Sequence, residues 1–281
     1  MAAAEITRAE TAARARLLRV ESYAVELDLT RGPEVFGSTS RIRFGCAEPG
    51  AATYLDLVAA QVHSITLNGN VVDPASAWAD GRIILGGLAA GNEVVVVADC
   101  RYSRDGTGLH RAVDPADGKV YCYTKFEPAY ARGVYANFEQ PDLKASFTTS
   151  VIAPAHWTVL ANEQLAGTSP ASPGPDGAER RRWQFRATPL LPTYLFAIAA
   201  GEYTVVSASH TTPGGQEIPL GLACRASLAE FQAADEILAI TRRGPCPAGP
   251  DPGQRRRPDL CGRPLRRSLR GHAAGSYRRA H

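Results

Sequence analysis

The chain has 281 residues, 44% of them hydrophobic and 21% charged, a composition typical of a globular protein with a hydrophobic core. Its formal net charge of +3 predicts neither a nucleic-acid nor a membrane partner, and no apolar run is long enough to span a bilayer. The N-terminus lacks the apolar stretch of a signal peptide, and the six cysteines form no C-x-x-C pair. We therefore expect a cytoplasmic protein with reduced thiols and without a zinc finger.

The predicted elements begin with a short amphipathic helix over residues 7–18, where Thr7 and Glu10 have the spacing of a capping box. Apolar and polar residues then alternate over residues 23–29, which predicts a half-buried strand. Asn68-Gly69 is a strong hairpin-turn signal within residues 62–72. Four consecutive valines at 94–97 predict a strand that is covered on both faces. Further strands are expected at residues 38–45, 82–85, 146–152, 157–161, 182–186, 194–199 and 218–223.

Many short strands separated by Gly- and Pro-rich turns predict a mostly β fold, an antiparallel β-sandwich or a saddle-like double sheet. One convincing helix follows these strands, because Ser227 has the chemistry of an N-cap and apolar residues recur at helical spacing over 228–242. We therefore predict a β domain over residues 1–226, the start of a linker helix over 227–243, and a separate tail over 244–281.

The tail over 244–281 contains nine Arg, no Lys, two Asp and no Glu. Such a segment buries too little apolar surface to offset its chain entropy, so we expect it to be disordered. One interpretation is an arginine-rich arm that binds RNA. We favour another, a GC-rich gene read out of frame, which also yields mostly Arg, Pro, Gly and Ala. The nucleotide sequence around the stop codon would decide between them.

Residues 121–147 form the most informative segment. Glu127 lies between Phe126 and Pro128, and the run Phe-Glu-Gln-Pro at 138–141 precedes an apolar strand. These residues resemble T-[KQ]-F-E-P and F-D-E-P in the N-terminal domain of the aminopeptidase N family, the zinc-dependent gluzincin aminopeptidases. The resemblance covers about residues 5–243. It implies the substrate-recognition domain of a peptide hydrolase that releases N-terminal amino acids.

The resemblance also gives Glu127 a role, which is to hold the free α-ammonium of a peptide N-terminus. A fixed carboxylate does so through charge-assisted hydrogen bonds. The alternative is a surface carboxylate paired with Lys125 or Arg132, which would contribute little. If the ammonium role holds, Glu127 should be accessible to solvent, near the rim of an exposed apolar surface where a catalytic domain docks.

The second motif departs from the family pattern. Glu139 and Gln140 stand where the family has Asp and Glu, so a charge-specific role for this pair is not implied by the resemblance. We expect a structural role here instead, in which Phe138 and Pro141 fix a turn ahead of the following strand.

The catalytic motifs of that family are absent from this sequence. A gluzincin needs H-E-x-x-H on a helix to bind zinc and activate water, and none of the six His precedes Glu. The G-x-M-E-N exopeptidase motif is missing too, because Met1 is the only Met. We therefore expect a chain cut off before its catalytic domain and inactive alone, with no catalytic residue and no bound metal. Zinc is expected only in the full-length family enzyme.

The expected partners follow from the same resemblance. They are the peptide N-terminus in the full enzyme and the missing catalytic domain as a docking partner, with no membrane and no nucleic acid. A non-enzymatic alternative remains open, because a β-sandwich that binds a protein or a carbohydrate in an exposed groove would look the same in sequence.

Overall fold

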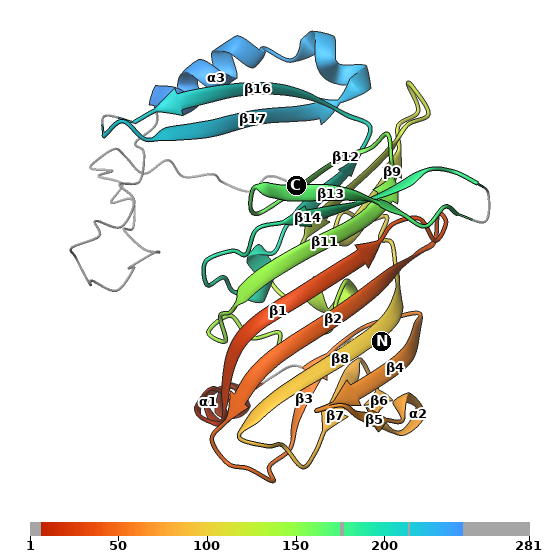
Figure 1. Ribbon diagram of the computed structural model, residues 1–281, viewed down its shortest axis with the longest axis vertical. Helices are drawn as coiled ribbons and strands as arrows, with labels where there is room; N and C mark the ends of the chain where they lie inside the picture. Colours follow the sequence, from red (N-terminus) through yellow and green to blue (C-terminus); the bar gives the residue numbers. More distant parts are fainter. Residues whose placement is uncertain (1–6, 175–176, 213, 244–281) are drawn as a thin grey trace, which may run out of the picture.

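The computed structural model describes residues 7–174, 177–212 and 214–243, whose strands form four sheets (Figure 1). The largest sheet has the strand order β13-β14-β11-β1-β2-β8-β4-β5. Its strands are β1 (Leu18–Asp28), β2 (Val35–Cys46), β4 (Gln61–Leu67), β5 (Asn70–Val72), β8 (Gly91–Arg101), β11 (Ser146–Pro154), β13 (Leu165–Ala171) and β14 (Arg180–Phe185). β1 and β11 run parallel, with Ser22 opposite Ser146, while the other pairs in this sheet are antiparallel. The predicted mostly β class is confirmed.

Three smaller sheets complete the β structure. One has the order β12-β15-β10-β9, another β3-β7-β6, and β16 and β17 pair only with each other. These strands are β3 (Thr53–Asp56), β6 (Trp78–Ala79), β7 (Arg82–Leu85), β9 (Gly108–Val113), β10 (Val120–Lys125), β12 (Thr158–Ala161), β15 (Ile198–Gly201), β16 (Tyr203–Thr211) and β17 (Glu217–Arg225). The helices are α1 (Arg8–Leu17), α2 (Pro74–Ala77), α3 (Ala234–Arg243) and the 3-10 turns η1 (Ala131–Gly133), η2 (Thr193–Leu195) and η3 (Ala226–Phe231).

Two local predictions are confirmed in detail. At the start of α1 the Thr7 hydroxyl accepts the Glu10 N–H at 3.2 Å, while the Glu10 carboxylate accepts the Thr7 N–H at 2.8 Å, which is the predicted capping box. The hairpin between β4 and β5 turns at Asn68 and Gly69, whose φ angles of 53° and 82° are both positive. Turns of this kind match the right-handed twist of the strands that they join.

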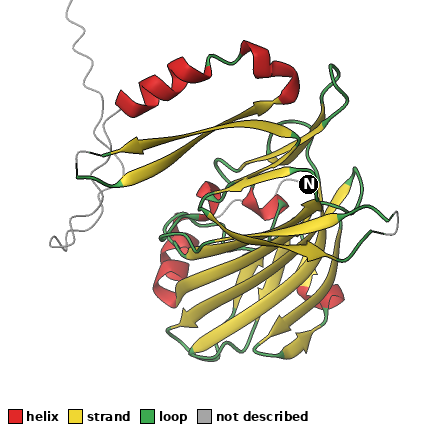
Figure 2. Cartoon of the chain, turned by 45° about the horizontal axis from the view of Figure 1, so that its top comes forward, coloured by secondary structure: helices red, strands yellow, loops and turns green. Residues whose placement is uncertain are grey.

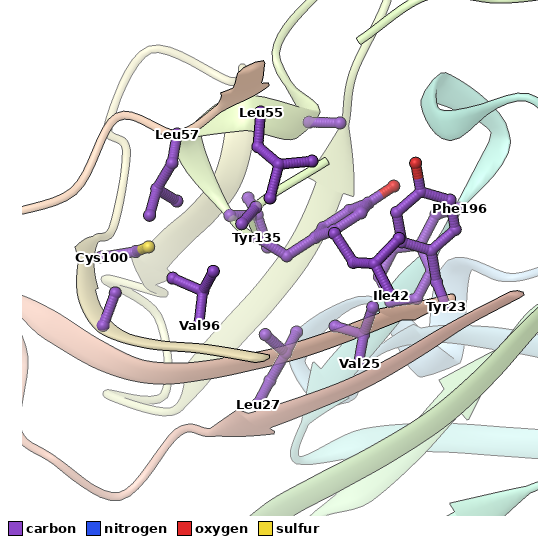
Figure 3. Packing of buried hydrophobic residues seen from close by; sticks show 14 of the residues in the cluster. Tyr23, Val25, Leu27, Ile42, Leu55, Leu57, Val96, Cys100, Tyr135 and Phe196 are labelled. Carbon is purple, nitrogen blue, oxygen red and sulfur yellow. The ribbon is translucent and has the colours of Figure 1, made fainter. Parts of the chain in front are cut away.

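The core lies between the large sheet and the smaller elements that cover one of its faces (Figure 3). From Tyr23 to Leu27 of β1 every second side chain points inward, so Val25 and Leu27 are buried as the alternation predicts. Leu55 of β3 packs from the opposite side, together with Tyr135 and Phe196. Full burial of a single side chain such as Leu27 contributes about 1.5–3 kcal/mol to folding.

Two strand predictions need correction. Val94 and Val96 are buried, but Val95 and Val97 are half-exposed, so β8 is covered on one face and not on both. The four valines lie in the middle of β8, in a sheet whose outer face meets solvent, where β-branched residues still favour a strand. The strand expected at 194–199 begins only at Ile198, because residues 193–195 form the 3-10 turn η2.

The C-terminal helix also differs from its prediction. Residues 226–231 form the 3-10 turn η3, the chain is extended at Gln232, and α3 begins only at Ala234. Ser227 is not an N-cap, since its hydroxyl donates to the Asp114 carboxylate at 2.7 Å instead. α3 packs along the β16–β17 hairpin, apart from the large sheet (Figure 2). The domain boundaries stay predictions, and the tail over 244–281 lies outside the described residues.

Candidate functional site

The segment that carries Glu127 leaves the end of β10 and is anchored at once. Phe126 is buried, and its ring stacks on Phe196 with 6.2 Å between centroids. Tyr135 lies 5.0 Å from the same Phe196 ring and donates its hydroxyl to the Thr193 carbonyl at 3.0 Å. Aromatic pairs of this geometry stabilise beyond the area that they bury. The two ends of residues 126–135 are therefore fixed in one aromatic cluster.

Between these anchors Glu127 is exposed to solvent, as the ammonium-binding hypothesis requires. A cis peptide joins it to Pro128. Arg132, the partner suggested by the alternative hypothesis, pairs with Glu139 at 2.8 Å. Tyr130 donates its N–H to the Phe126 carbonyl at 2.9 Å, which closes a tight loop around Glu127.

Glu139 makes the densest set of contacts in the segment. Its carboxylate accepts the N–H of Ala131 at 2.9 Å and that of Arg132 at 3.1 Å, in addition to the Arg132 guanidinium. Burial raises the pKa of Glu139 from 4.5 to about 7, although Arg132 and the two N–H groups act in the opposite direction. The expectation of a purely structural turn therefore missed a charged contact at Glu139.

The other residues of the second motif lie against the core. Phe138 is fully buried, and its ring meets Phe44 edge-on with 5.1 Å between centroids. Its N–H donates to the Tyr23 hydroxyl at 3.1 Å. Pro141 is exposed, in the turn that the Leu143 N–H closes on the Gln140 carbonyl. The segment is thus tied both to the large sheet and to the strand that follows.

An apolar row crosses the outer face of the four-stranded sheet next to this loop. Leu160, Ala199, Tyr123 and His110 stand opposite one another on β12, β15, β10 and β9. Leu160 and Tyr123 are exposed, and the Tyr123 ring packs on His110 with 5.0 Å between centroids. Because side chains alternate along a strand, Lys125 shares this face with Tyr123. We call Leu160, Ala199, Tyr123 and His110 the outer apolar row.

An open pocket of about 410 Å³ is lined in part by the residues that follow Glu127. The turn at Ala129, Tyr130, Arg132 and Gly133 forms one wall. A Gly-rich loop over residues 103–108 forms the rest, together with Leu109, Val58 and Arg101. In the Gly-rich loop Gly108 has a φ of 58°, a conformation that glycine adopts without strain. The loop therefore shapes a pocket wall, and it is not followed by the helix that a phosphate-binding loop needs.

Residues 7–174, 177–212 and 214–243 contain no group of three His, Cys, Asp or Glu side chains that could hold a metal ion. Within the same residues no helix is long and apolar enough to cross a membrane. Cys100 and Cys122 are buried as free thiols, and burial raises the pKa of each to about 12. Such thiols are inert packing groups at neutral pH.

Sequence reasoning singled out Glu127 but missed the partners that hold its loop. The structure brings together Glu139, Arg132 and the Ala131 N–H within the same segment, with Asp56 of β3 nearby. Asp56 accepts the Glu139 N–H at 3.4 Å, although the two residues are far apart in sequence. The signal for Glu139 was an acidic residue inside a buried aromatic segment, where a carboxylate needs a partner.

Comparison of the sequence with known proteins identifies relatives of this chain. Residues 100–195 match the family described as Peptidase M1 N-terminal domain. Aminopeptidase N from Streptomyces lividans is 44% identical over 247 residues, which cover 87% of this chain but 28% of that protein. A probable M1 family aminopeptidase from Encephalitozoon cuniculi is 35% identical over 120 residues, 42% of this chain and 13% of its own length.

A solved structure supports the fold. Legionella pneumophila aminopeptidase A, crystallised in complex with aspartic acid, superposes with a TM-score of 0.64 at 20% identity. The match covers 76% of this chain and 25% of that protein. The chain therefore spans between an eighth and little more than a quarter of the length of these relatives.

Proposed function

This chain contains an N-terminal domain of the peptidase M1 family, and from this premise we propose that it forms the substrate-recognition part of a zinc aminopeptidase. In that enzyme Glu127 would hold the ammonium group of the peptide N-terminus. The exposure of Glu127 on an anchored loop carries the proposal, because a carboxylate must be both accessible and fixed to bind an ammonium group selectively.

The chemistry assigned to this chain is binding and orientation. An ionised Glu127 would accept hydrogen bonds from a free α-ammonium, which an internal peptide N–H cannot imitate. The described residues do not fit a zinc site, so the proposal leaves metal binding and the attack on the peptide bond to residues outside this sequence. In the intact enzyme the zinc would activate water and polarise the scissile carbonyl.

The proposed docking partner of this chain is the catalytic domain of such an enzyme. The outer apolar row includes Tyr123 of β10, the strand whose C-terminal end is followed closely by Glu127. More exposed apolar side chains follow at the C-terminal end of the described chain: Leu228, Phe231, Ile237 and Ile240. Exposed apolar groups in such number favour an interface over a free surface. Docking there would leave the Glu127 loop at the junction between the two domains.

A fusion protein tests the proposal. Residues 1–243 would replace the matching N-terminal part of the Streptomyces lividans aminopeptidase N, and hydrolysis of an amino-acid arylamide would be measured. Loss of a hydrogen bond to a charged group predicts that Glu127→Gln lowers kcat/KM roughly 10- to 100-fold. Glu21→Gln, at an exposed position of β1, is the matched control and should leave activity unchanged. Equal activity of the two variants would rule out the ammonium role.

A further inference from the structure

The loop around Glu127 is anchored in the aromatic cluster at its ends, and a buried carboxylate, Glu139, contacts the turn that follows it. We propose that Glu139 is a positioning residue, which clamps the η1 turn and thereby sets where the Glu127 carboxylate stands. This inference rests on the role proposed for Glu127, and it adds the device that holds that residue in place.

The first step of the argument is the convergence of donors on Glu139. The N–H groups of Ala131 and Arg132 and the Nε of Arg132 all lie within 3.1 Å of its two oxygens. The two carboxylate oxygens accept one backbone N–H each, and the Arg132 guanidinium adds an ion-pair contact. A neutral or shorter side chain would leave part of this set unpaired inside a region where water is largely excluded.

The second step leads from the clamp to Glu127. Arg132 also donates its Nε to the Ala129 carbonyl at 2.9 Å, two residues beyond Glu127. On the other side the Phe126 carbonyl accepts the Tyr130 N–H at 2.9 Å. Residues 126–130 are therefore held at one end by the aromatic cluster and at the other by Arg132, whose own position depends on Glu139. The clamp thus acts on the loop through Arg132.

The third step shows what holds Glu139 itself. Its N–H faces the Asp56 carboxylate, and Asp56 forms a two-way backbone bridge with Asn137 at 2.8 and 3.1 Å. Asp56 in turn is paired with Arg14 of α1 and Arg82 of β7. The clamp is therefore tied to three elements of the rigid part of the domain, whereas Glu127 itself stands on a loop.

The charged and titratable groups around Glu139 come from several elements. Arg132 lies on η1, Asp56 on β3, and the hydroxyls of Tyr23 and Tyr135 are near enough for the Glu139 charge to affect their pKa. Arg132 is the cation in direct contact, and its side chain is about one-fifth exposed while that of Glu139 is 4% exposed. The ion pair is therefore mostly shielded from water, where charged contacts are stronger than at the surface.

The position of the turn gives it a second consequence for the same site. Arg132 and Gly133 of the clamped turn also line the pocket of about 410 Å³, together with Ala129 and Tyr130. A change at Glu139 would therefore move a pocket wall and the Glu127 loop together. A carboxylate that only filled space in the core would affect neither.

Hydrogen exchange and carboxyl-carbon NMR on the full chain test this inference. Glu139→Ala should speed exchange of the Ala131 and Arg132 amides about tenfold or more, because both acceptor oxygens are gone. Glu139→Gln keeps one acceptor oxygen and should restore part of the protection. In both variants the Glu127 carboxyl signal should shift. Glu26→Gln, which removes a different Glu–Arg pair in the large sheet, is the control and should change none of these signals.

Protection within twofold of the unaltered chain in both Glu139 variants, with an unmoved Glu127 signal, would overturn the inference. If Glu139→Ala does not fold, the Gln variant together with Arg132→Lys gives the answer, because lysine lacks the Nε–H group that donates to Ala129 beside the Glu139 carboxylate. The readout is the order of the loop alone. The two tests are therefore independent. The Glu139 variants can loosen the loop even if the Glu127→Gln fusion keeps its activity, and they can leave the loop unchanged even if that fusion loses activity.

Discussion

The large sheet and the C-terminal hairpin are built from similar strands but differ in burial. In β1 five residues are buried, whereas no residue of β16 or β17 is buried, and η3 likewise exposes its apolar side chains. In α3 only Leu238 is buried among the residues for which burial is described. Within the described chain, therefore, the large sheet has its complete core, while the hairpin and its helix have apolar surface that only another surface could cover.

The largest expected difference between the two regions is in their response to truncation. Leu27→Ala in β1 should lower the free energy of unfolding by about 2–5 kcal/mol, because it leaves a cavity in a fully packed core. Val205→Ala in β16 should change it by less than about 0.5 kcal/mol. Urea unfolding of both variants measures the contrast. Equal losses would show that the hairpin shares the packing of the large sheet.

The second expected effect is a dependence of stability on pH that originates at Glu139. The pKa of Glu139 is raised from 4.5 to about 7. Between these two pH values the folded chain therefore binds a proton that the unfolded chain has released. Stability from this group is therefore present at low pH and lost as pH rises through about 7, by roughly 3 kcal/mol.

Urea unfolding between pH 5 and 8 would measure this loss. Glu139→Gln should flatten the decline, and Glu26→Gln should leave it as it is. A decline of the same steepness in the Glu139 variant would assign it to other groups.

A smaller effect is expected at the junction of the two regions. Asp114 accepts the Ser227 hydroxyl at 2.7 Å and pairs with Arg225 at 3.1 Å, which ties the start of η3 to the turn after β9. Asp114→Ala should loosen this junction, so a protease should cut residues 226–233 faster while the large sheet stays intact. Asp142→Ala, at an exposed position away from the junction, is the control. Unchanged cleavage would mean that other contacts, such as the hydrogen bond from the Ala226 N–H to the Tyr121 hydroxyl, hold the junction without Asp114.

The smallest effect on stability is expected at Phe231, which is 75% exposed. Phe231→Ser should shift the free energy of unfolding by less than about 0.5 kcal/mol. We also expect the exposed apolar side chains to make the chain self-associate. Phe231→Ser should reduce this association, as measured by sedimentation, because it removes the largest exposed apolar side chain of η3. If association is unchanged, the outer apolar row becomes the better candidate for the surface that mediates self-association.

Local patterns predicted much of the fold. The alternation in β1, the capping box at Thr7 and the turn at Asn68 each depend on neighbouring residues, so the sequence displays them directly. An error arose where a distant contact decides. Ser227 forms its hydrogen bond with Asp114, far away in the chain, and so does not cap a helix.

The candidate site also has one residue that neighbouring residues predict and one that depends on distant contacts. The exposure of Glu127 could be expected from a motif of neighbouring residues. The clamp at Glu139 could not, because its burial depends on the packing of β1, β3 and η1 around one carboxylate. The family pattern even directed attention away from this residue, since the sequence has Glu where the motif has Asp.

The parallel pairing of β1 with β11 has a consequence for the order in which the chain folds. Ser22 must pair with Ser146 across parallel strands, and a tight hairpin cannot join strands in this orientation. Contacts of this range are formed slowly, because the entropy of closing the intervening chain must be overcome first. The loop of Glu127 lies within that intervening chain. Phe126, at the start of the loop, stacks on Phe196, which is synthesised after β11. During synthesis the loop can therefore reach its final geometry only after both segments have left the ribosome, so it is among the later parts of the domain to become ordered.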